Sequence, residues 1–191
     1  MNGIILAGGE NRRMGRDKAF LDIDGRPMIA HILDVFSKLF ERIIVVTNMP
    51  DRYRNYDVDV TGDVLDIRGP LTGIYSGLLR STDEYNFVAA CDMPFLNPRL
   101  ISYMGKIAAG QDAVVPQFNG FLEPLHAIYS KRTLSTIESH IRSNERRIYP
   151  IFDHLDVRYL TEDEIHRFDP DRRSLKNINT PEEYKEAVCL D

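Results

Sequence analysis

The sequence predicts an α/β fold built on an open, mostly parallel sheet with helices on both faces. Three observations support this class: short runs of apolar residues, amphipathic stretches with helical spacing, and a regular alternation of the two along the chain. Uninterrupted apolar runs are typical of strands buried on both faces, and their alternation with helices is typical of parallel sheets. Ligands of such sheets bind beyond the carboxyl ends of the strands, so the residues that follow each strand are the first candidates for a site.

The first strand is predicted at residues 3–7, a continuous apolar run that ends at a pair of glycines. The next element is a helix beginning near Pro27, because apolar residues recur at helical intervals from Ile29 to Phe40 and proline suits a first turn. Further strands are predicted at residues 42–47, 58–61, 86–91, 112–116, 125–129 and 176–179.

Four more helices are predicted from their starting residues and apolar spacing. They begin after residues 69–73, at Pro98 with Asn97 as the N-cap, near residue 134, and after Thr180. In the last of these, Thr180 is expected to cap the helix, Pro181 to take its first position and Glu183 to complete a capping box. Residues 153–173 are charged and weakly patterned, and we expect an irregular excursion there.

Length and composition limit the classes of function. A chain of 191 residues fits one domain, residues 1–191, and 43% hydrophobic with 28% charged residues excludes a disordered chain. The net charge of −5 excludes an overall positive field that would attract nucleic acid or anionic lipid. Cys91 and Cys189 form no disulfide framework or metal-binding spacing, and no apolar run is long enough to span a bilayer. The cytoplasm is the expected location, with neither nucleic acid nor membrane as a partner.

The loop after the first strand carries the strongest chemical signal. Residues 6–18 read LAGGENRRMGRDK, with three glycines that let the backbone approach an anion and with Arg12, Arg13 and Lys18 to add positive charge. The pattern is neither a P-loop nor the dinucleotide GxGxxG motif. A solvent-exposed turn is the alternative, but the combination of buried strand, glycines and cations favours binding of nucleoside triphosphate phosphates.

Asp92 directly follows the strand predicted at residues 86–91. A carboxylate at this end of a strand faces the ligand crevice, where Mg²⁺ bridging phosphates needs an oxygen ligand. The alternative is a helix N-cap, but Pro94 delays the helix and the cap role falls more naturally to Asn97. Beside the phosphate loop, Mg²⁺ ligation by Asp92 is favoured, and Cys91 is expected to be a small buried residue.

Three further segments are weaker candidates. Residues 69–73, which follow Asp63, read GPLTG and could lie against a planar base, although a plain turn is the alternative. Residues 123–126 read EPLH, and the histidine, His126, lies in the apolar strand predicted at residues 125–129. A buried core residue is a simpler interpretation of His126 than a catalytic one. Residues 145–147 read ERR and could hold a second phosphate, although such charged pairs are usually only solvated.

Together these motifs resemble a known family. LAGGENRRMGRDK is similar to the signature loop of nucleotidyltransferases that activate sugars, pterins and isoprenoid precursors. GPLTGI, CDMPF, PLHAIY, ERRIY and NINTPEEY occur in the order and spacing of the molybdenum cofactor guanylyltransferases. The resemblance spans residues 3 to about 184 and implies a three-layer, Rossmann-like nucleotidyltransferase fold. It also implies GTP and molybdopterin as ligands and Mg²⁺ as cofactor, with GTP bound by the N-terminal half and the acceptor by the C-terminal half.

The resemblance also implies roles for individual residues. Those implied to bind the nucleotide are Leu6, Ala7, Gly8, Gly9, Lys18, Asn48, Asp63, Gly69 and Asp92. Arg13, Lys18 and Asp92 are implied to be catalytic, Asp92 as the metal ligand, and Asn177 and Asn179 are implied to face the pterin. At one nucleoside contact the register leaves Thr47 or Asn48, and Asn48 is preferred because its amide both donates and accepts.

The implied reaction is attack by the terminal phosphate of molybdopterin on the α-phosphorus of GTP, with release of pyrophosphate. The alternatives are a related molybdopterin cytidylyl, sugar or isoprenoid nucleotidyltransferase, and a non-catalytic nucleotide-binding module. Transient contact with molybdoenzyme maturation proteins is plausible for a reactive cofactor, although no docking surface can be identified in the sequence.

Overall fold

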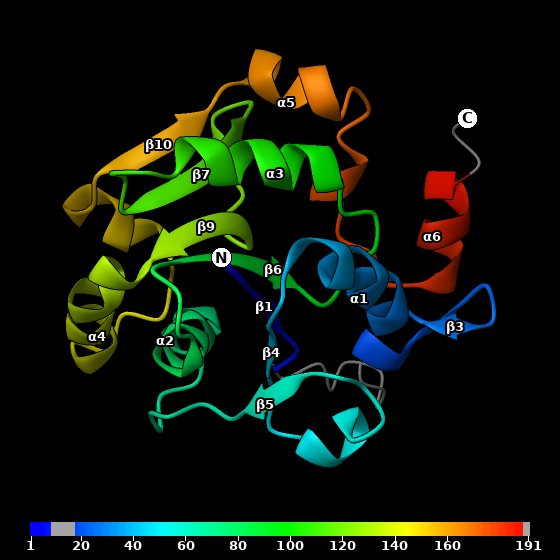
Figure 1. The fold of residues 1–191 in the computed structure, drawn as a ribbon, viewed down its shortest axis with the longest axis horizontal. Coiled ribbons are helices and arrows are strands. Elements are labelled where there is room, and N and C mark those ends of the chain that lie inside the picture. The colour runs from blue at the N-terminus through cyan, green and yellow to red at the C-terminus, as the bar shows by residue number, and fades with distance from the viewer. Residues whose placement is uncertain (9–17, 189–191) are drawn as a thin grey trace.

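A computed structural model of the chain describes residues 1–8 and 18–188 (Figure 1), and its main element is an eight-stranded sheet. Seven strands follow the spatial order β10-β7-β9-β6-β1-β4-β5, and β8 pairs with β7 beside them. Their bounds are β1 (Asn2–Leu6), β4 (Ile43–Val46), β5 (Asp59–Thr61), β6 (Tyr85–Ala90), β7 (Ala113–Phe118), β8 (Phe121–Leu122), β9 (His126–Ser130) and β10 (Val157–Leu160). Outside this sheet, β2 (Asp22–Ile23) and β3 (Arg26–Pro27) form a small hairpin.

Helices cover both faces of the sheet, which confirms the predicted three-layer fold. They are α1 (Met28–Leu39), α2 (Pro70–Arg80), α3 (Pro98–Ile107), α4 (Leu134–Arg142), α5 (Glu162–Phe168) and α6 (Pro181–Val188). One hydrophobic cluster joins the sheet to α1, α3 and α5, and a second joins it to α2 and α4. Adjacent residues of β1 enter different clusters, Ile5 the first and Ile4 the second, as expected for a strand buried on both faces.

The sheet is mostly parallel, as predicted. β1 runs parallel to β4 and β6, β4 to β5, and β7 to β10. β9 is antiparallel to both of its neighbours, β6 and β7. The carboxyl ends of β1, β4 and β6 therefore meet at one edge of the sheet.

Two predictions of secondary structure were wrong. Residues 176–179 form no strand; instead the Ile178 N–H donates to the backbone carbonyl of Asp92 at 2.7 Å. The supposed excursion at 153–173 contains β10 and α5, the latter with a capping box between Thr161 and Glu164. β10 is an edge strand whose first three residues are only half-buried, so its sequence lacks the apolar run of the central strands.

The structure confirms the predicted cap of α3 and shows the predicted capping box of α6 displaced by one residue. The Asn97 side chain accepts from the N–H groups of Arg99 (2.9 Å) and Leu100 (3.2 Å), which confirms it as the cap of α3. Thr180 Oγ1 accepts from the Glu183 N–H at 3.1 Å. The Glu183 carboxylate, however, accepts from the N–H of Asn179 at 2.5 Å, so the box is displaced by one residue.

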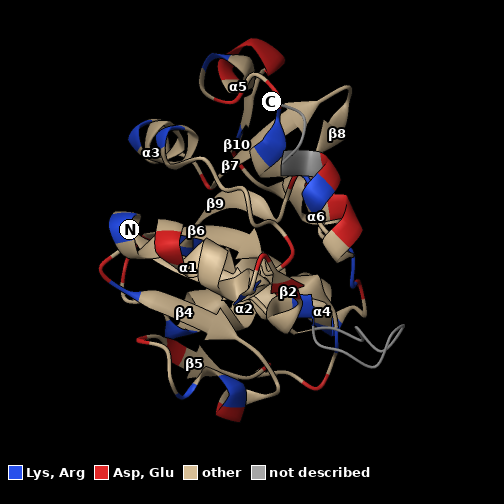
Figure 2. Ribbon diagram, turned by 90° about the vertical axis from the view of Figure 1, so that its right-hand side faces the viewer, with Lys and Arg blue, Asp and Glu red and all other residues tan. Residues whose placement is uncertain are grey.

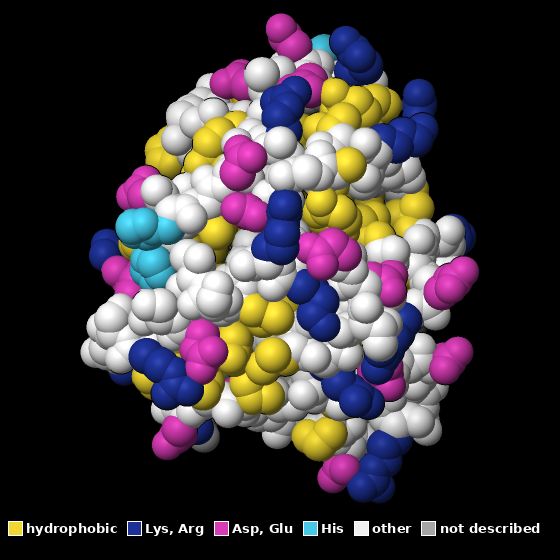
Figure 3. Space-filling view, turned by 60° about the vertical axis from the view of Figure 1, so that its left-hand side comes forward, with side chains coloured by type: hydrophobic (Ala, Val, Ile, Leu, Met, Phe, Trp, Pro, Cys, Tyr) yellow, Lys and Arg dark blue, Asp and Glu magenta, His cyan; other side chains and the backbone are white. Residues whose placement is uncertain are grey.

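Charges of both signs are distributed over the surface. Figure 2 shows basic and acidic residues on the helices and loops, while the strands are largely uncharged. The face in Figure 3 likewise intersperses the two signs around small apolar patches. In the described part of the chain, no helix is both long enough and apolar enough to cross a membrane.

A matched pair of helical glycines gives a test of the packing between α2 and the sheet. A Cβ on Gly77 would lie 2.5 Å from Cγ2 of the fully buried Ile4, whereas one on Gly105 would lie 3.2 Å from the flexible end of Met1. We expect Gly77→Ala to lower the free energy of unfolding by about 1–3 kcal/mol through overpacking. Gly105→Ala should leave it unchanged or raise it by up to about 1 kcal/mol through helix propensity. Urea denaturation measures both, and equal effects would contradict the packing argument.

Candidate active site

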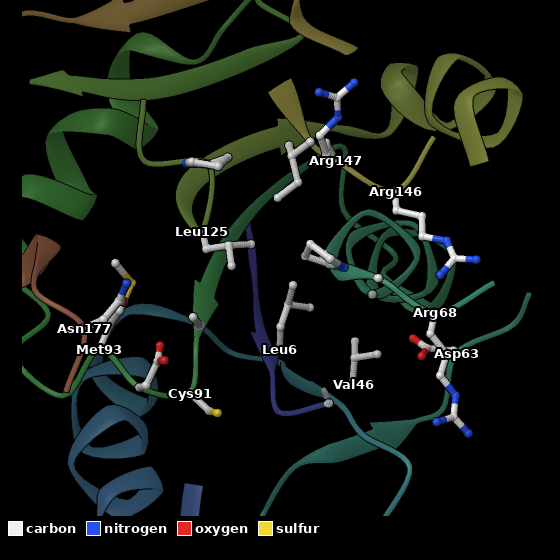
Figure 4. Close-up of a pocket in the computed structure, with 18 of the residues that line it drawn as sticks. Leu6, Val46, Asp63, Arg68, Cys91, Met93, Leu125, Arg146, Arg147 and Asn177 are labelled. Carbon is white, nitrogen blue, oxygen red and sulfur yellow. The ribbon is translucent and has the colours of Figure 1, made fainter. Parts of the chain in front are cut away.

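A cavity of about 890 Å³ opens at the carboxyl ends of β1, β4 and β6. Its floor includes Leu6, Val46 and Ala90, the last residues of those three strands. Figure 4 shows Asn177 and Met93 toward one end, Asp63 and Arg68 toward the other, and Leu6 between them. The cavity is therefore long enough in one direction to present different groups to the two halves of a ligand.

At the end near Asp63, polar groups from three elements line the cavity. Asn48 follows β4, Asp63 follows β5, and Gly69 precedes α2. Burial raises the pKa of the Asp63 carboxyl, while a hydrogen bond from Asn48 and the charge of Arg68 lower it. Thr47 is buried and its hydroxyl accepts from the Met49 N–H, so Asn48 is the residue of that pair that lines the cavity.

A lysine, a carboxylate and an amide meet at the end of the cavity near Met93 and Asn177. Lys18 Nζ lies 3.4 Å from Asp92 Oδ2 and donates to Asn179 Oδ1 at 2.5 Å. Asp92 follows β6 and lines the cavity, and both ion-pair partners stay partly exposed, with side chains 30% and 20% accessible. This arrangement joins a cation and a carboxylate from the N-terminal half to the amide of Asn179 from the C-terminal segment.

The segment before α6 is held against Asp92 by its backbone. Ile178 is buried in a small cluster with Ile23 and Met28, and its N–H bonds to the Asp92 carbonyl. Asn177 on one side lines the cavity, and Asn179 on the other contacts Lys18. The carboxylate of Glu183 fixes the Asn179 N–H, so both asparagines extend from an anchored backbone.

The residues predicted at the end of the first strand and in the loop after it do not all line the cavity. Leu6 and Gly8 line the cavity, but Ala7 does not: it is buried and its N–H donates to the Val46 carbonyl at 2.9 Å. Gly9 and Arg13 lie outside the described residues.

Three basic side chains and one acidic side chain line the cavity in addition to the residues predicted there, and one of the basic side chains is Arg68. Arg146 and Arg147 were considered only as a possible phosphate site, and both line the cavity. Hydrogen bonds from Arg147 lower the pKa of Glu145 to about 2, so this pair stays ionised. Glu123 also lines the cavity, and its position in EPLH, directly before a predicted strand, is the sequence signal for it.

His126 is a core residue, which confirms the interpretation favoured from the sequence. It is fully buried, packs edge-on against Phe87 with ring centroids 5.0 Å apart, and does not line the cavity. Neither ring nitrogen has a hydrogen-bond partner in residues 1–8 and 18–188. Burial lowers the pKa of His126 to about 4, although the charge of Asp169 opposes the shift.

This depressed pKa predicts a stability change at acid pH. Between about pH 6.5 and pH 4 the unfolded chain binds a proton on His126 that the folded chain does not, so stability is lost as the pH falls through that window. We expect His126 to account for a loss of up to about 3 kcal/mol by pH 4 and for none above pH 7. Urea denaturation from pH 4 to pH 7 measures this, and His126→Phe should flatten the curve. An unchanged curve in the variant would place the effect on another group.

Known proteins are similar to this chain over most of its length. Residues 3–159 match the family model described as MobA-like NTP transferase domain. A molybdenum cofactor guanylyltransferase of Desulfosudis oleivorans is 40% identical over 98% of this chain and 94% of its own length. That of Syntrophotalea carbinolica is 34% identical over 96% and 89%.

A solved structure agrees as well. The crystal structure titled molybdopterin-guanine dinucleotide biosynthesis protein A, from Archaeoglobus fulgidus, superimposes with a TM-score of 0.86 at 28% identity, covering 99% of this chain and 98% of its own. The chain therefore belongs to the MobA-like NTP transferase family, and within it to the molybdenum cofactor guanylyltransferases, which are nucleotidyltransferase enzymes.

Proposed function

We propose that this protein transfers GMP from GTP to the terminal phosphate of molybdopterin and releases pyrophosphate, with Mg²⁺ as cofactor. The observation that carries the proposal is the meeting of Lys18, Asp92 and Asn179 beside a cavity lined at its other end by Asn48 and Asp63. The names of the relatives at 34–40% identity support the choice of nucleotide and acceptor. Because GTP is a cytoplasmic nucleotide, the proposal also locates the reaction in the cytoplasm.

The proposed step needs no nucleophile from the protein. An oxygen of the acceptor phosphate attacks the α-phosphorus of GTP, the bond from that phosphorus to the bridging oxygen breaks, and pyrophosphate leaves with the bond electrons. The protein's contribution is positioning and neutralisation of charge. We assign Lys18 and Arg13 to the charge that develops on pyrophosphate. We assign Asn177 and Asn179 to the acceptor side, and the guanidinium groups of Arg146 and Arg147 to phosphate charge.

Asp92 is the residue that would hold Mg²⁺. It is a partly exposed carboxylate on the cavity wall, and no group of three or more acidic, histidine or cysteine side chains suited to a metal occurs in the described residues. One carboxylate together with substrate phosphates is the usual way in which proteins bind this ion, so the donor set fits. When bound, Mg²⁺ supplies Lewis-acid neutralisation of phosphate charge.

The nucleotide end fits a nucleoside, because Asn48 can donate and accept while Asp63 accepts from hydroxyl or ring N–H groups. We expect GTP with Mg²⁺ to raise the midpoint of thermal unfolding more than CTP, ATP or UTP at the same concentration, because a ligand that binds the folded state more tightly stabilises it more. A larger shift with CTP would favour the cytidylyl alternative.

The reaction is tested by pyrophosphate release with each of the four nucleoside triphosphates and molybdopterin as acceptor, with mass spectrometry of the product. The proposal predicts release with GTP and a guanine dinucleotide product. GTP binding without release would favour a non-catalytic nucleotide-binding module. Transient delivery of the product to molybdoenzyme maturation proteins remains part of the proposal and is tested by pull-down with such proteins.

A further inference from the structure

Glu123 presents a carboxylate to the cavity from a rigid part of the chain. It lies in the short connection between β8 and β9. Its N–H donates to the Pro116 carbonyl at 2.9 Å, and its own carbonyl accepts from the His126 N–H at 3.1 Å. The backbone that carries this side chain is therefore hydrogen-bonded through both its N–H and its carbonyl, and the side chain lines the cavity.

This carboxylate is half-buried, and no side chain in residues 1–8 and 18–188 donates a hydrogen bond to it or pairs with it. Burial raises the pKa of Glu123, with no nearby charge acting against the shift. A carboxylate desolvated without donors is costly, and such groups in a binding cavity are commonly completed by donors on the ligand. The ligand groups that would complete this carboxylate are N–H donors.

An aromatic ring lies beside this carboxylate at the rim of the cavity. Tyr149 lines the cavity with 52% of its surface exposed, and its hydroxyl donates to the carbonyl of Leu122, the residue before Glu123, at 3.3 Å. Leu125 and Ile148 add apolar residues to the lining of the cavity. A carboxylate acceptor next to an exposed ring and an apolar wall suits a flat heterocycle with two N–H donors along one edge.

We propose that Glu123 recognises the ring of the acceptor, with its two oxygens accepting from the ring N–H and the amino group of a 2-amino-4-oxopyrimidine edge, while Tyr149 packs against the face of that ring. The assignment to a pterin rests on the proposed function. Guanine has the same edge, so the position of Glu123 decides between the two. Glu123 lies two residues before Leu125 in the connection between β8 and β9. Figure 4 shows Leu125 on the side of the cavity away from Asp63 and Arg68, the end assigned to the nucleotide.

The experiment compares pterin with lumazine, in which an oxygen replaces the 2-amino group, by fluorescence titration of the full-length protein. Unmodified protein should bind pterin about 10- to 100-fold more tightly than lumazine. With lumazine the hydrogen bond from the 2-amino group to the carboxylate is lost, and the oxygen in its place repels the carboxylate oxygen of Glu123. Glu123→Gln should abolish this preference, because the amide can donate to the lumazine oxygen. Glu84→Gln, which removes a carboxylate outside the cavity, should retain it.

A second experiment, the transfer assay, distinguishes the two rings that Glu123 could bind, the pterin of the acceptor and the guanine of GTP. In the transfer assay Glu123→Gln should raise the KM for molybdopterin about 10- to 100-fold and leave the KM for GTP, and the preference for GTP over ITP, unchanged. A raised KM for GTP alone would assign Glu123 to guanine and overturn the proposal. Three other results would also overturn the proposal. They are equal binding of pterin and lumazine by the unmodified protein, no binding of either compound, and an unchanged preference for pterin in the Glu123→Gln variant. Failure of the proposed function is a separate result, namely no GMP transfer by unmodified protein that still prefers pterin.

Discussion

Replacing Asp92 with Asn should lower kcat for GMP transfer by about a thousand-fold in saturating Mg²⁺, the order lost when a charge-stabilising group is removed from an active site. The amide keeps the shape of the side chain but loses the charge that would hold a metal ion and that lies 3.4 Å from Lys18 Nζ. The fold should survive, because the bond from the Ile178 N–H goes to the backbone carbonyl of Asp92 and not to its carboxylate. Steady-state rates over a range of Mg²⁺ concentrations, with a thermal melt of each variant, measure both statements.

Asp112→Asn is the matched control for that variant. The Asp112 carboxylate is similarly shielded, with 24% of the side chain accessible, and it pairs with Arg132 at 3.3 Å, outside the cavity. We expect kcat within about two-fold of the unmodified protein, because Asp112 does not line the cavity. Loss of its surface ion pair should change stability little. If Asp92→Asn kept near-normal activity in Mg²⁺, the assignment of the metal to Asp92 would be wrong.

Replacing Lys18 with Met should lower kcat by about a hundred- to a thousand-fold, because the ammonium group is assigned to the charge that develops on the leaving pyrophosphate. Methionine preserves most of the length of the side chain while removing its charge and its three donors. The change also leaves Asp92 and Asn179 without their shared partner, so the KM for both substrates should rise. Lys18→Arg should restore activity only in part, because a planar fork does not replace a compact ammonium in a contact of 2.5 Å.

Lys131→Met serves as the control, since Lys131 donates to the carbonyl of Ser81 at 2.7 Å in a half-buried position away from the cavity. It should cost some stability and leave kcat unchanged. A Lys18→Met variant with normal kcat and a raised KM for GTP would show that the lysine contributes only to binding, and the catalytic role would then be withdrawn.

Much of the fold could be predicted because its signals are local. The apolar run of β1, the proline at the start of α3 with Asn97 as its cap, and Asp92 after β6 each depend on a few neighbouring residues. β10 and the extended residues 176–179 could not be predicted, because an edge strand and an anchored extended segment are decided by what lies beside them. Local preference at those positions is weak, and tertiary packing outweighs it.

By itself, the sequence determined the class of chemistry, because glycines, cations and a carboxylate placed after buried strands suit phosphate binding wherever the chain goes. Tertiary structure alone decided which residues meet. Lys18 and Asn179 are 161 residues apart in the chain, yet their side chains are hydrogen-bonded. Glu123 lines the cavity, whereas His126, three residues later, lies buried in the core. The physical reason is that Glu123 lies in the connection before β9, at the edge of the cavity, while His126 is the first residue of β9 and its ring packs against Phe87 of the neighbouring strand β6.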